Sequence, residues 1–331
     1  MSNRRTIRET VEVGIHNVAA LQGSLLTAVQ LEFSTIPPYL CAEWSINSEH
    51  DGDPSGVSDM IHTVVMQEML HFGLACNMYV ATGGSLEGEI ATPGFVPVYP
   101  ANGLPGGVHP GLLVSLLPLG SQALQTFMSI EYPEVTPVVQ QPDTPPPPAP
   151  PTPPTIGQFY QKITDAFSIM FPDGSLPHNP SVHQVVTSVD SDQLFAINTA
   201  TDALNAIKEI TDQGEGASAS PERGALDPGI LAHYYTFAEI YYGKTVAQVG
   251  GGFQYSDPTI TMPTVRNFVP QPPGAPGQQT FIQNFATLMT QLEQCWTRGS
   301  SFVTARRTMS QLRTAGTDLI KAGFTPQFTL A

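Results

Sequence analysis

Positive charge is scarce in this sequence of 331 residues. The chain has 13 lysine and arginine residues against 28 aspartate and glutamate residues, a formal net charge of −15 at pH 7. Such a chain repels a phosphate backbone or an anionic membrane surface. We therefore expect no nucleic acid and no membrane among its partners.

Cysteine is also rare, and long apolar runs are missing. The three cysteines are Cys41, Cys76 and Cys295. They are an odd number in apolar surroundings and lack the paired spacing of a zinc or redox motif, so we expect reduced core residues. No apolar run of the kind found in a signal peptide or membrane anchor follows the basic residues 4–8. These features predict a cytoplasmic protein.

Common catalytic motifs are absent as well. The sequence contains no P-loop, no dinucleotide-binding fingerprint and no GxSxG elbow. What it does contain is 41% hydrophobic residues at a mean hydropathy of −0.04, the composition of a soluble globular protein. A chain of this length can bury a core without disulfides.

Apolar residues recur at helical spacing over most of the chain. The predicted helices cover residues 12–46, 58–82, 121–130, 156–167, 199–213 and 229–242, and a pair over 280–322 broken near Gly299. Pro37 and Pro38 remove backbone donors, so we expect a break or kink just after Glu32. Ser58 is the expected N-cap of the second helix.

Glycine and proline gather in two other segments. Their density between residues 83 and 120 predicts an extended excursion, with a short strand near 95–99. The run at 142–154 predicts a polyproline spacer at the surface. The fold class is mainly α, and we expect one domain over 1–331. Its core covers about 12–245, and the helical pair at 280–322 packs on the bundle.

The segment QEMLH is the most specific candidate for chemistry. Glu68 and His71 lie three residues apart, which places both side chains on one face of a helix. Burying such polar groups among apolar neighbours is costly unless a partner or a metal neutralises them. A surface pair or an internal hydrogen bond is the alternative. Glu32, an acid among apolar residues of the preceding helix, favours a site built from several helices.

Further ligands remain open on the residues alone. Glu131 at the end of the third helix is a candidate, with Glu134 as its competitor. No second E-x-x-H motif exists; Glu215 lies between glycines and is preferred to Glu209, which fits a solvated acid.

Histidine offers one more candidate. His233 is interpreted as a ligand, against the alternative of a core histidine. Glu239 lies about 240° further around the same helix, and we expect a structural or surface role for it.

Five segments carry a resemblance to a known family. They are LEFSTIPPYLCAEWSI, VVMQEMLHFGLACNMYVATGG, FMSIEYPE, QGEG and HYYTFAEI. In this order they resemble the ferritin-like family that includes the iminophenyl-pyruvate dimer synthase domains of bisindole biosynthesis. The resemblance covers roughly residues 18–245 and implies a ferritin-like four-helix bundle with long loop insertions and extra C-terminal helices. It implies as metal ligands Glu32, Glu68, His71, Glu131, Glu215 and His233.

The resemblance says less about the reaction than about the fold and the metal site. The violacein- and rebeccamycin-type members couple two imines derived from aromatic 2-oxo acids, but they are much longer chains. We expect a non-haem iron oxidase or oxygenase that uses dioxygen on a small aromatic or amino-acid-derived metabolite. Iron would bind as one or two ions, with manganese as an alternative metal. A metal-binding or storage protein without turnover and a structural bundle with paired acids are the rivals, and a homo-oligomer stays open.

Overall fold

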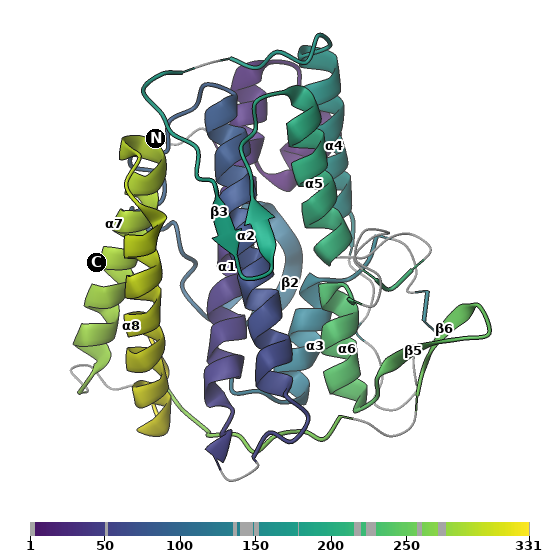
Figure 1. Cartoon of the computed structure of the whole chain (residues 1–331), viewed down its shortest axis with the longest axis vertical. Coiled ribbons are helices and arrows are strands. Elements are labelled where there is room, and N and C mark those ends of the chain that lie inside the picture. Colours follow the sequence, from purple (N-terminus) through teal and green to yellow (C-terminus); the bar gives the residue numbers. More distant parts are fainter. Residues whose placement is uncertain are drawn as a thin grey trace.

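The computed structural model describes residues 4–49, 52–134, 138–139, 148, 152–177, 179–214, 220–222, 230–256, 260–270 and 276–330. Its α-helices are α1 (Val18–Ser45), α2 (Val57–Ala81), α3 (Ser121–Ile130), α4 (Ile156–Met170), α5 (Ala200–Gly214), α6 (His233–Tyr242), α7 (Gln278–Arg298) and α8 (Phe302–Lys321). A π-helix covers Glu9–Val13 and a 3-10 turn covers Pro105–Gly107. The antiparallel strand pairs are β1 (Ala101–Leu104) with β2 (Val108–Val114), β3 (Thr187–Val189) with β4 (Asp192–Leu194), and β5 (Val246–Val249) with β6 (Gly252–Tyr255). The predicted mainly α fold is confirmed (Figure 1).

Two long helices and two pairs of short helices form a four-helix bundle. The helices α1 and α2 pack along each other, and each remaining position of the bundle is filled by two short helices. One position holds α3 and α4, which both contact α1; the other holds α5 and α6, which both contact α2. Figure 1 shows α4 above α3 and α5 above α6. The bundle therefore has a break in two of its four positions at about mid-height.

Helix α1 continues through its two prolines. The expected break after Glu32 is wrong, because α1 is helical from Val18 to Ser45 with Pro37 and Pro38 inside it. Pro38 cannot donate to the carbonyl of Ser34, four residues earlier. The hydroxyl of Tyr99 donates to that oxygen instead, at 2.6 Å. A side chain from outside the helix thus satisfies the group that the proline leaves free.

Helix α2 begins one residue earlier than expected and has a different cap. The Asp53 carboxylate accepts hydrogen bonds from the backbone N–H groups of Val57 and Ser58, both at 2.9 Å. Ser58 therefore lies inside the helix, and its predicted capping role is wrong. Gly83, with φ +87°, follows the helix and ends it as expected.

The excursion after α2 contains strands, though not where expected. Strands β1 and β2 pair on either side of residues 105–107, and their register shifts between Asn102 and Leu104. The strand predicted near 95–99 is wrong. There the carbonyl of Phe95 accepts from the Gln30 side chain at 2.7 Å, and Tyr99 bonds to α1. Side-chain contacts to α1 replace the neighbouring strand that a β-ladder needs.

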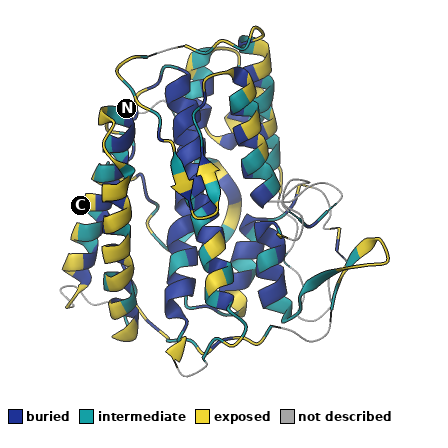
Figure 2. Ribbon diagram, in the orientation of Figure 1, coloured by how far each residue is buried: buried dark blue, intermediate teal, exposed yellow. Residues whose placement is uncertain are grey.

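The last two helices cover the outer side of α1. Gly299 ends α7 with φ +64°, which confirms the predicted break. The ring of Phe285 lies 6.4 Å from that of Phe33, and Phe281 lies 6.3 Å from Trp44. With bundle helices on its other side, α1 buries 22 of its 28 residues rather than a single stripe. Figure 2 shows this buried centre and the exposed outer faces of α7 and α8.

Three other expectations concern surface and core. The cysteines are free and buried, as predicted. Most of the proline-rich run at 142–154 lies outside the described residues. Among the described helices, none is both long and apolar enough to cross a membrane.

Candidate metal centre

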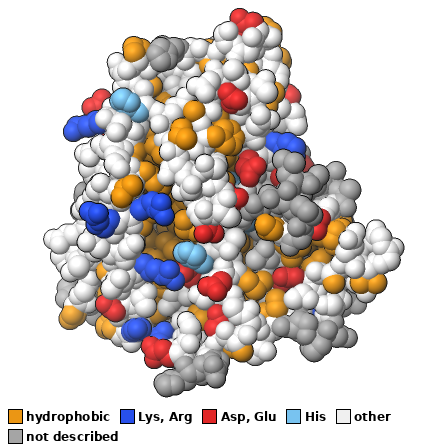
Figure 3. Space-filling view, viewed as in Figure 1, with side chains coloured by type: hydrophobic (Ala, Val, Ile, Leu, Met, Phe, Trp, Pro, Cys, Tyr) orange, Lys and Arg blue, Asp and Glu red, His pale blue; other side chains and the backbone are white. Residues whose placement is uncertain are grey.

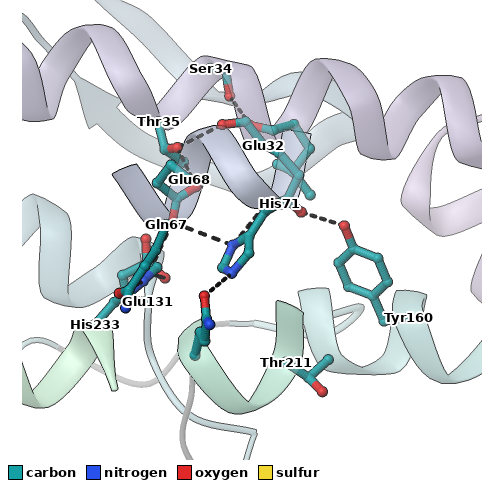
Figure 4. A network of polar contacts seen from close by, with 12 residues as sticks. Glu32, Ser34, Thr35, Gln67, Glu68, His71, Glu131, Tyr160, Thr211 and His233 are labelled. Carbon is teal, nitrogen blue, oxygen red and sulfur yellow. Dashed lines mark hydrogen bonds and ion pairs between the residues drawn. The ribbon is translucent and has the colours of Figure 1, made fainter. Parts of the chain in front are cut away.

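Five of the six residues proposed as ligands converge inside the bundle, at the level of the breaks between the short helices (Figure 4). Glu32 comes from α1, Glu68 and His71 come from α2, Glu131 follows the last residue of α3, and His233 is the first residue of α6. Their exposed fractions are 8% or less. The break places a helix end and a helix start beside the continuous helices, so ligands from all four positions of the bundle meet.

The five side chains form two groups that share one carboxylate. Glu32, Glu68 and His71 have ligand atoms within 4.8 Å of one another, and so do Glu68, Glu131 and His233. Oε1 of Glu68 lies 2.9 Å from Nδ1 of His233 and 3.8 Å from Nδ1 of His71. Each histidine Nδ1 also lies 3.5 Å from a second carboxylate, that of Glu32 or Glu131. Glu68 therefore lies between two pockets of one glutamate and one histidine each.

Glutamine side chains orient both imidazole rings. Nε2 of His71 lies 2.9 Å from Oε1 of Gln213, and Nε2 of His233 lies 2.9 Å from Oε1 of Gln67. Gln213 in turn donates its amide to Glu209 at 2.5 Å, which fixes its oxygen toward His71. An amide oxygen accepts only, so each ring donates a hydrogen bond from Nε2 and turns Nδ1 toward the carboxylates. In this orientation, Nδ1 of each ring could bind a metal once it has lost its proton.

Hydroxyl groups hold the three carboxylates from behind. Tyr160 donates to Oε1 of Glu32, Thr35 donates to Oε2 of Glu68 at 2.7 Å, and Tyr39 donates to Oε1 of Glu131 at 2.5 Å. Burial, together with the nearby carboxylates, raises the pKa of both tyrosines well above the ordinary value. They therefore remain protonated donors and leave the other carboxylate lone pairs facing the centre.

The buried negative charge of the cluster favours a bound cation. Among the described residues, no lysine or arginine forms an ion pair with Glu32, Glu68 or Glu131. Burial raises the pKa of Glu68, and the charge of Glu131 raises it further. Burial lowers the pKa of His233, but the neighbouring carboxylates of Glu131 and Glu68 outweigh this effect and raise it to about 9. Without a metal, protons on the histidines offset part of the buried negative charge.

One buried nitrogen of the cluster is left without a hydrogen-bond partner in the described part of the chain and is available to a metal. Nδ1 of His233 is buried and has no hydrogen-bond partner among the described residues, although Oε1 of Glu68 is 2.9 Å away. The two atoms are close without the alignment of a hydrogen bond. Imidazole nitrogen and carboxylate oxygen in this arrangement are donors that suit divalent iron, manganese or zinc. The cluster could hold a metal ion.

A small cavity adjoins the cluster. It has a volume of about 40 Å³ and is lined by Glu32, Glu68, His71 and Glu131 together with Tyr160 and Thr211. This is space for a molecule little larger than water. The walls at Ile130, Ile156 and Ile210 are apolar.

The remaining acids predicted from sequence have other positions. Glu215 lies outside the described residues. Glu134 accepts a hydrogen bond from Thr155, the residue that caps α4. The Glu239 carboxylate is buried and accepts from the backbone N–H of Val246 at 2.5 Å, in line with the structural role expected for it. Glu209 is not merely solvated, because it orients Gln213.

Sequence reasoning missed the residues that support the candidate ligands. Gln67, Gln213 and Thr35 are buried, and Tyr160 comes from a helix to which no site residue was assigned. Gln213 lies four residues after Glu209, a helical spacing that would have suggested their contact. Nothing in the sequence links that pair to His71, because the link is made across the bundle.

Fold and site together define a ferritin-like bundle with a carboxylate and histidine centre. The model of the ferritin-like family matches residues 25–242, more than half of the chain, and the chain belongs to this family. A crystal structure of a ferritin-like protein from Caulobacter vibrioides has a TM-score of 0.67 and 23% identity, with coverage of 96% of this chain and 100% of that one. That likeness concerns the fold.

A curated relative is an enzyme. Dichlorochromopyrrolate synthase from Lentzea aerocolonigenes is 27% identical over 196 residues. The aligned part is 56% of this chain and 18% of that protein. The chain is therefore similar to one section of a much longer enzyme.

Proposed function

We propose that the protein is a non-haem iron oxidase or oxygenase that binds two ions, and that Glu68 would be a ligand common to both binding positions. The observation that carries the proposal is the membership of Glu68 in both ligand groups, each with its own glutamate and histidine. Carboxylates and E-x-x-H pairs from different bundle helices are the ligand pattern of di-metal carboxylate proteins. Iron, when bound, supplies one-electron chemistry with dioxygen.

The chain's own residues provide a dry and oriented site. The apolar walls exclude bulk water, and the tyrosines Tyr39 and Tyr160 hold two carboxylates by hydrogen bonds. Gln67 and Gln213 keep Nδ1 of each histidine directed inward. The adjoining cavity of about 40 Å³ accommodates dioxygen rather than a whole aromatic metabolite. A larger substrate would therefore have to react at the edge of the site or after a side chain such as Tyr160 moves.

The substrate class is proposed from the relative. The Lentzea enzyme is a dichlorochromopyrrolate synthase, which favours a small aromatic or amino-acid-derived metabolite here. Since this chain is similar to 18% of that enzyme, the reaction itself does not carry over.

Metal analysis combined with oxygen uptake tests the proposal. Wild-type protein loaded anaerobically with Fe(II) and desalted should retain two equivalents, consume dioxygen and show a transient absorbance change. The double variant Glu68→Ala, His71→Ala should retain neither metal nor oxygen uptake. Glu87→Ala, His16→Ala is the matched control, because both side chains are exposed and neither belongs to the ligand groups or lines the adjoining cavity.

Three results would contradict the proposal. Undiminished iron in the Glu68 and His71 variant would remove the site. Retention of iron without any oxygen consumption would leave a metal-binding protein. Accumulation of many equivalents per chain during oxygen uptake would instead indicate storage.

A further inference from the structure

A second cavity lies on the opposite side of α1 and α2 from the metal centre. It has a volume of about 280 Å³ between these helices and the pair α7 and α8. On α1, Glu32 and Thr35 face the metal centre, whereas Phe33 and Ile36 line this cavity. The two sites are therefore separated by the α1–α2 layer, and a molecule in one does not touch the other.

Several large, polarisable side chains line the cavity. They are Phe33, Met66, Met69, Phe285, Met309 and Phe328. Methionine sulfur and aromatic rings adapt well to a flat or branched apolar group. The body of the cavity thus fits a single large apolar side chain.

One end of the cavity holds a buried carboxylate, that of Glu43. The side chain of Glu43 is 1% exposed, and its Oε1 lies 3.0 Å from Arg313 and 3.2 Å from Nδ1 of His62. The hydrogen bond to Glu43 raises the pKa of His62. Oε2 of Glu43 is buried without a hydrogen-bond partner among the described residues. A carboxylate oxygen in this position lacks a donor.

Charges of both signs stand at the mouth. Asp190, at the turn of the β3–β4 hairpin, has φ +52° and lines the cavity. Arg306 on α8 lines the other side and forms no ion pair within the part of the chain that the structure describes. Figure 3 shows the hollow on this face, with basic side chains on one side, a histidine and acids on the other and an apolar floor between.

A ligand with a single charge matches only half of these groups. A carboxylate alone would leave Asp190 and the free oxygen of Glu43 unmatched, whereas an amine alone would face Arg306 and Arg313. A molecule that carries an ammonium and a carboxylate on adjacent atoms complements both sets.

We propose that this cavity binds an α-amino acid with a large apolar side chain. The ammonium group bonds to Glu43 and Asp190, the carboxylate to Arg306 and Arg313, and the side chain fills the apolar body. A volume of about 280 Å³ equals roughly nine water-sized groups, in keeping with such a molecule. This binding site does not depend on the proposed oxidase function.

Calorimetric titration of the full-length protein with three matched probes tests the head group. L-Phenylalanine, 3-phenylpropanoate and 2-phenylethylamine share one apolar body and differ only in charge. We expect L-phenylalanine to bind and each analogue to bind at least tenfold more weakly. Equal binding of either analogue would overturn the proposal, and so would the absence of binding by L-phenylalanine, L-leucine and L-methionine at millimolar concentrations.

Substitutions at two neighbouring arginines test whether the amino acid binds in this cavity. Arg306→Glu should weaken L-phenylalanine binding at least tenfold, whereas Arg307→Glu, an exposed neighbour that does not line the cavity, should change it less than twofold. Equal effects of the two variants would contradict the assignment.

A cavity-filling variant gives an independent test. Met66→Trp should abolish binding while the circular dichroism spectrum and the melting temperature show a folded protein. If Met66→Trp unfolds the protein, the fluorescence of Trp44 shows instead whether the amino acid binds in the cavity, because the Trp44 ring lines it. The emission change on adding L-phenylalanine should then be lost in Trp44→Phe; a change that persists would come from Trp296 and would overturn the location.

Discussion

Oε1 of Glu68 on α2 lies 2.9 Å from Nδ1 of His233, the first residue of α6, and both atoms are buried. The contact joins the E-x-x-H helix to a histidine that has no E-x-x-H motif of its own. It also makes Glu68 the carboxylate common to both ligand groups, so substitutions around the centre should have unequal effects.

Glu68→Gln should remove both ions, whereas Glu32→Gln and Glu131→Gln should each remove one. The reason is that Glu68 belongs to both ligand groups and the other two glutamates to one each. The metal-to-protein ratio, measured by mass spectrometry after anaerobic loading and desalting, checks this. Glu87→Gln, an exposed substitution, should keep the wild-type ratio. A full equivalent retained by Glu68→Gln would show that the carboxylate is not shared.

Gln213→Leu should weaken metal binding about 10- to 100-fold, the usual cost of losing a partner that orients a metal-binding histidine. The leucine removes the acceptor of Nε2 of His71, so the ring is free to turn and to change its tautomer. Titration with Co(II), followed by its visible absorbance, measures the affinity. Gln213→Glu keeps an acceptor and should lose less metal affinity. Equal losses of affinity in the two variants would argue against an orienting role of Gln213.

Tyr99→Phe should lower the free energy of unfolding by about 1–2 kcal/mol, because it leaves the Ser34 carbonyl without a donor inside α1. Urea denaturation of the metal-free protein measures the change. Tyr132→Phe provides a control at a partly exposed tyrosine and should change stability by less than about 0.5 kcal/mol. Equal stability of Tyr99→Phe and wild type would mean that water satisfies the freed carbonyl.

Glu239 should make the stability pH-dependent. Burial raises its pKa in the folded protein to about 7. Between the unfolded pKa near 4.5 and about 7, the unfolded chain has lost this proton and the folded chain keeps it, so stability falls as pH rises. Glu239→Gln cannot ionise and should be more stable than wild type at pH 8, by at most about 3 kcal/mol, and similar at pH 4.

Urea denaturation of both proteins across this pH range measures the difference. Because other titrating groups are common to the two proteins, their contributions cancel. A difference that does not grow between pH 4 and pH 8 would show that Glu239 ionises normally in the folded state.

The helices were largely predictable because their signals are local. The spacing of apolar residues placed α3 at its observed bounds and α5 within one residue of them, and Gly299 marked the break between α7 and α8. Errors arose where a group outside the helix decided the outcome. Tyr99 satisfies a carbonyl inside α1, and Asp53 rather than Ser58 caps α2.

The candidate ligands also divide into those that local spacing predicts and those that only the packed bundle brings together. Glu68 and His71 could be paired from sequence, because three residues on a helix bring two side chains to one face. Glu32, Glu131 and His233 were candidates as polar residues in apolar segments or through the family resemblance, and only the packed bundle brings them to the same point. Which metal they bind stays a prediction.

The sequence by itself determined the mainly α class, most helix positions, and one helix turn that carries a carboxylate and an imidazole, because these depend on neighbours within a few residues. The tertiary structure alone decided that Glu68 joins two ligand groups, that Gln67 and Gln213 orient the histidines, and that a second charged cavity lies behind α1. Those relationships depend on how helices far apart in the chain pack against one another, which no local spacing records.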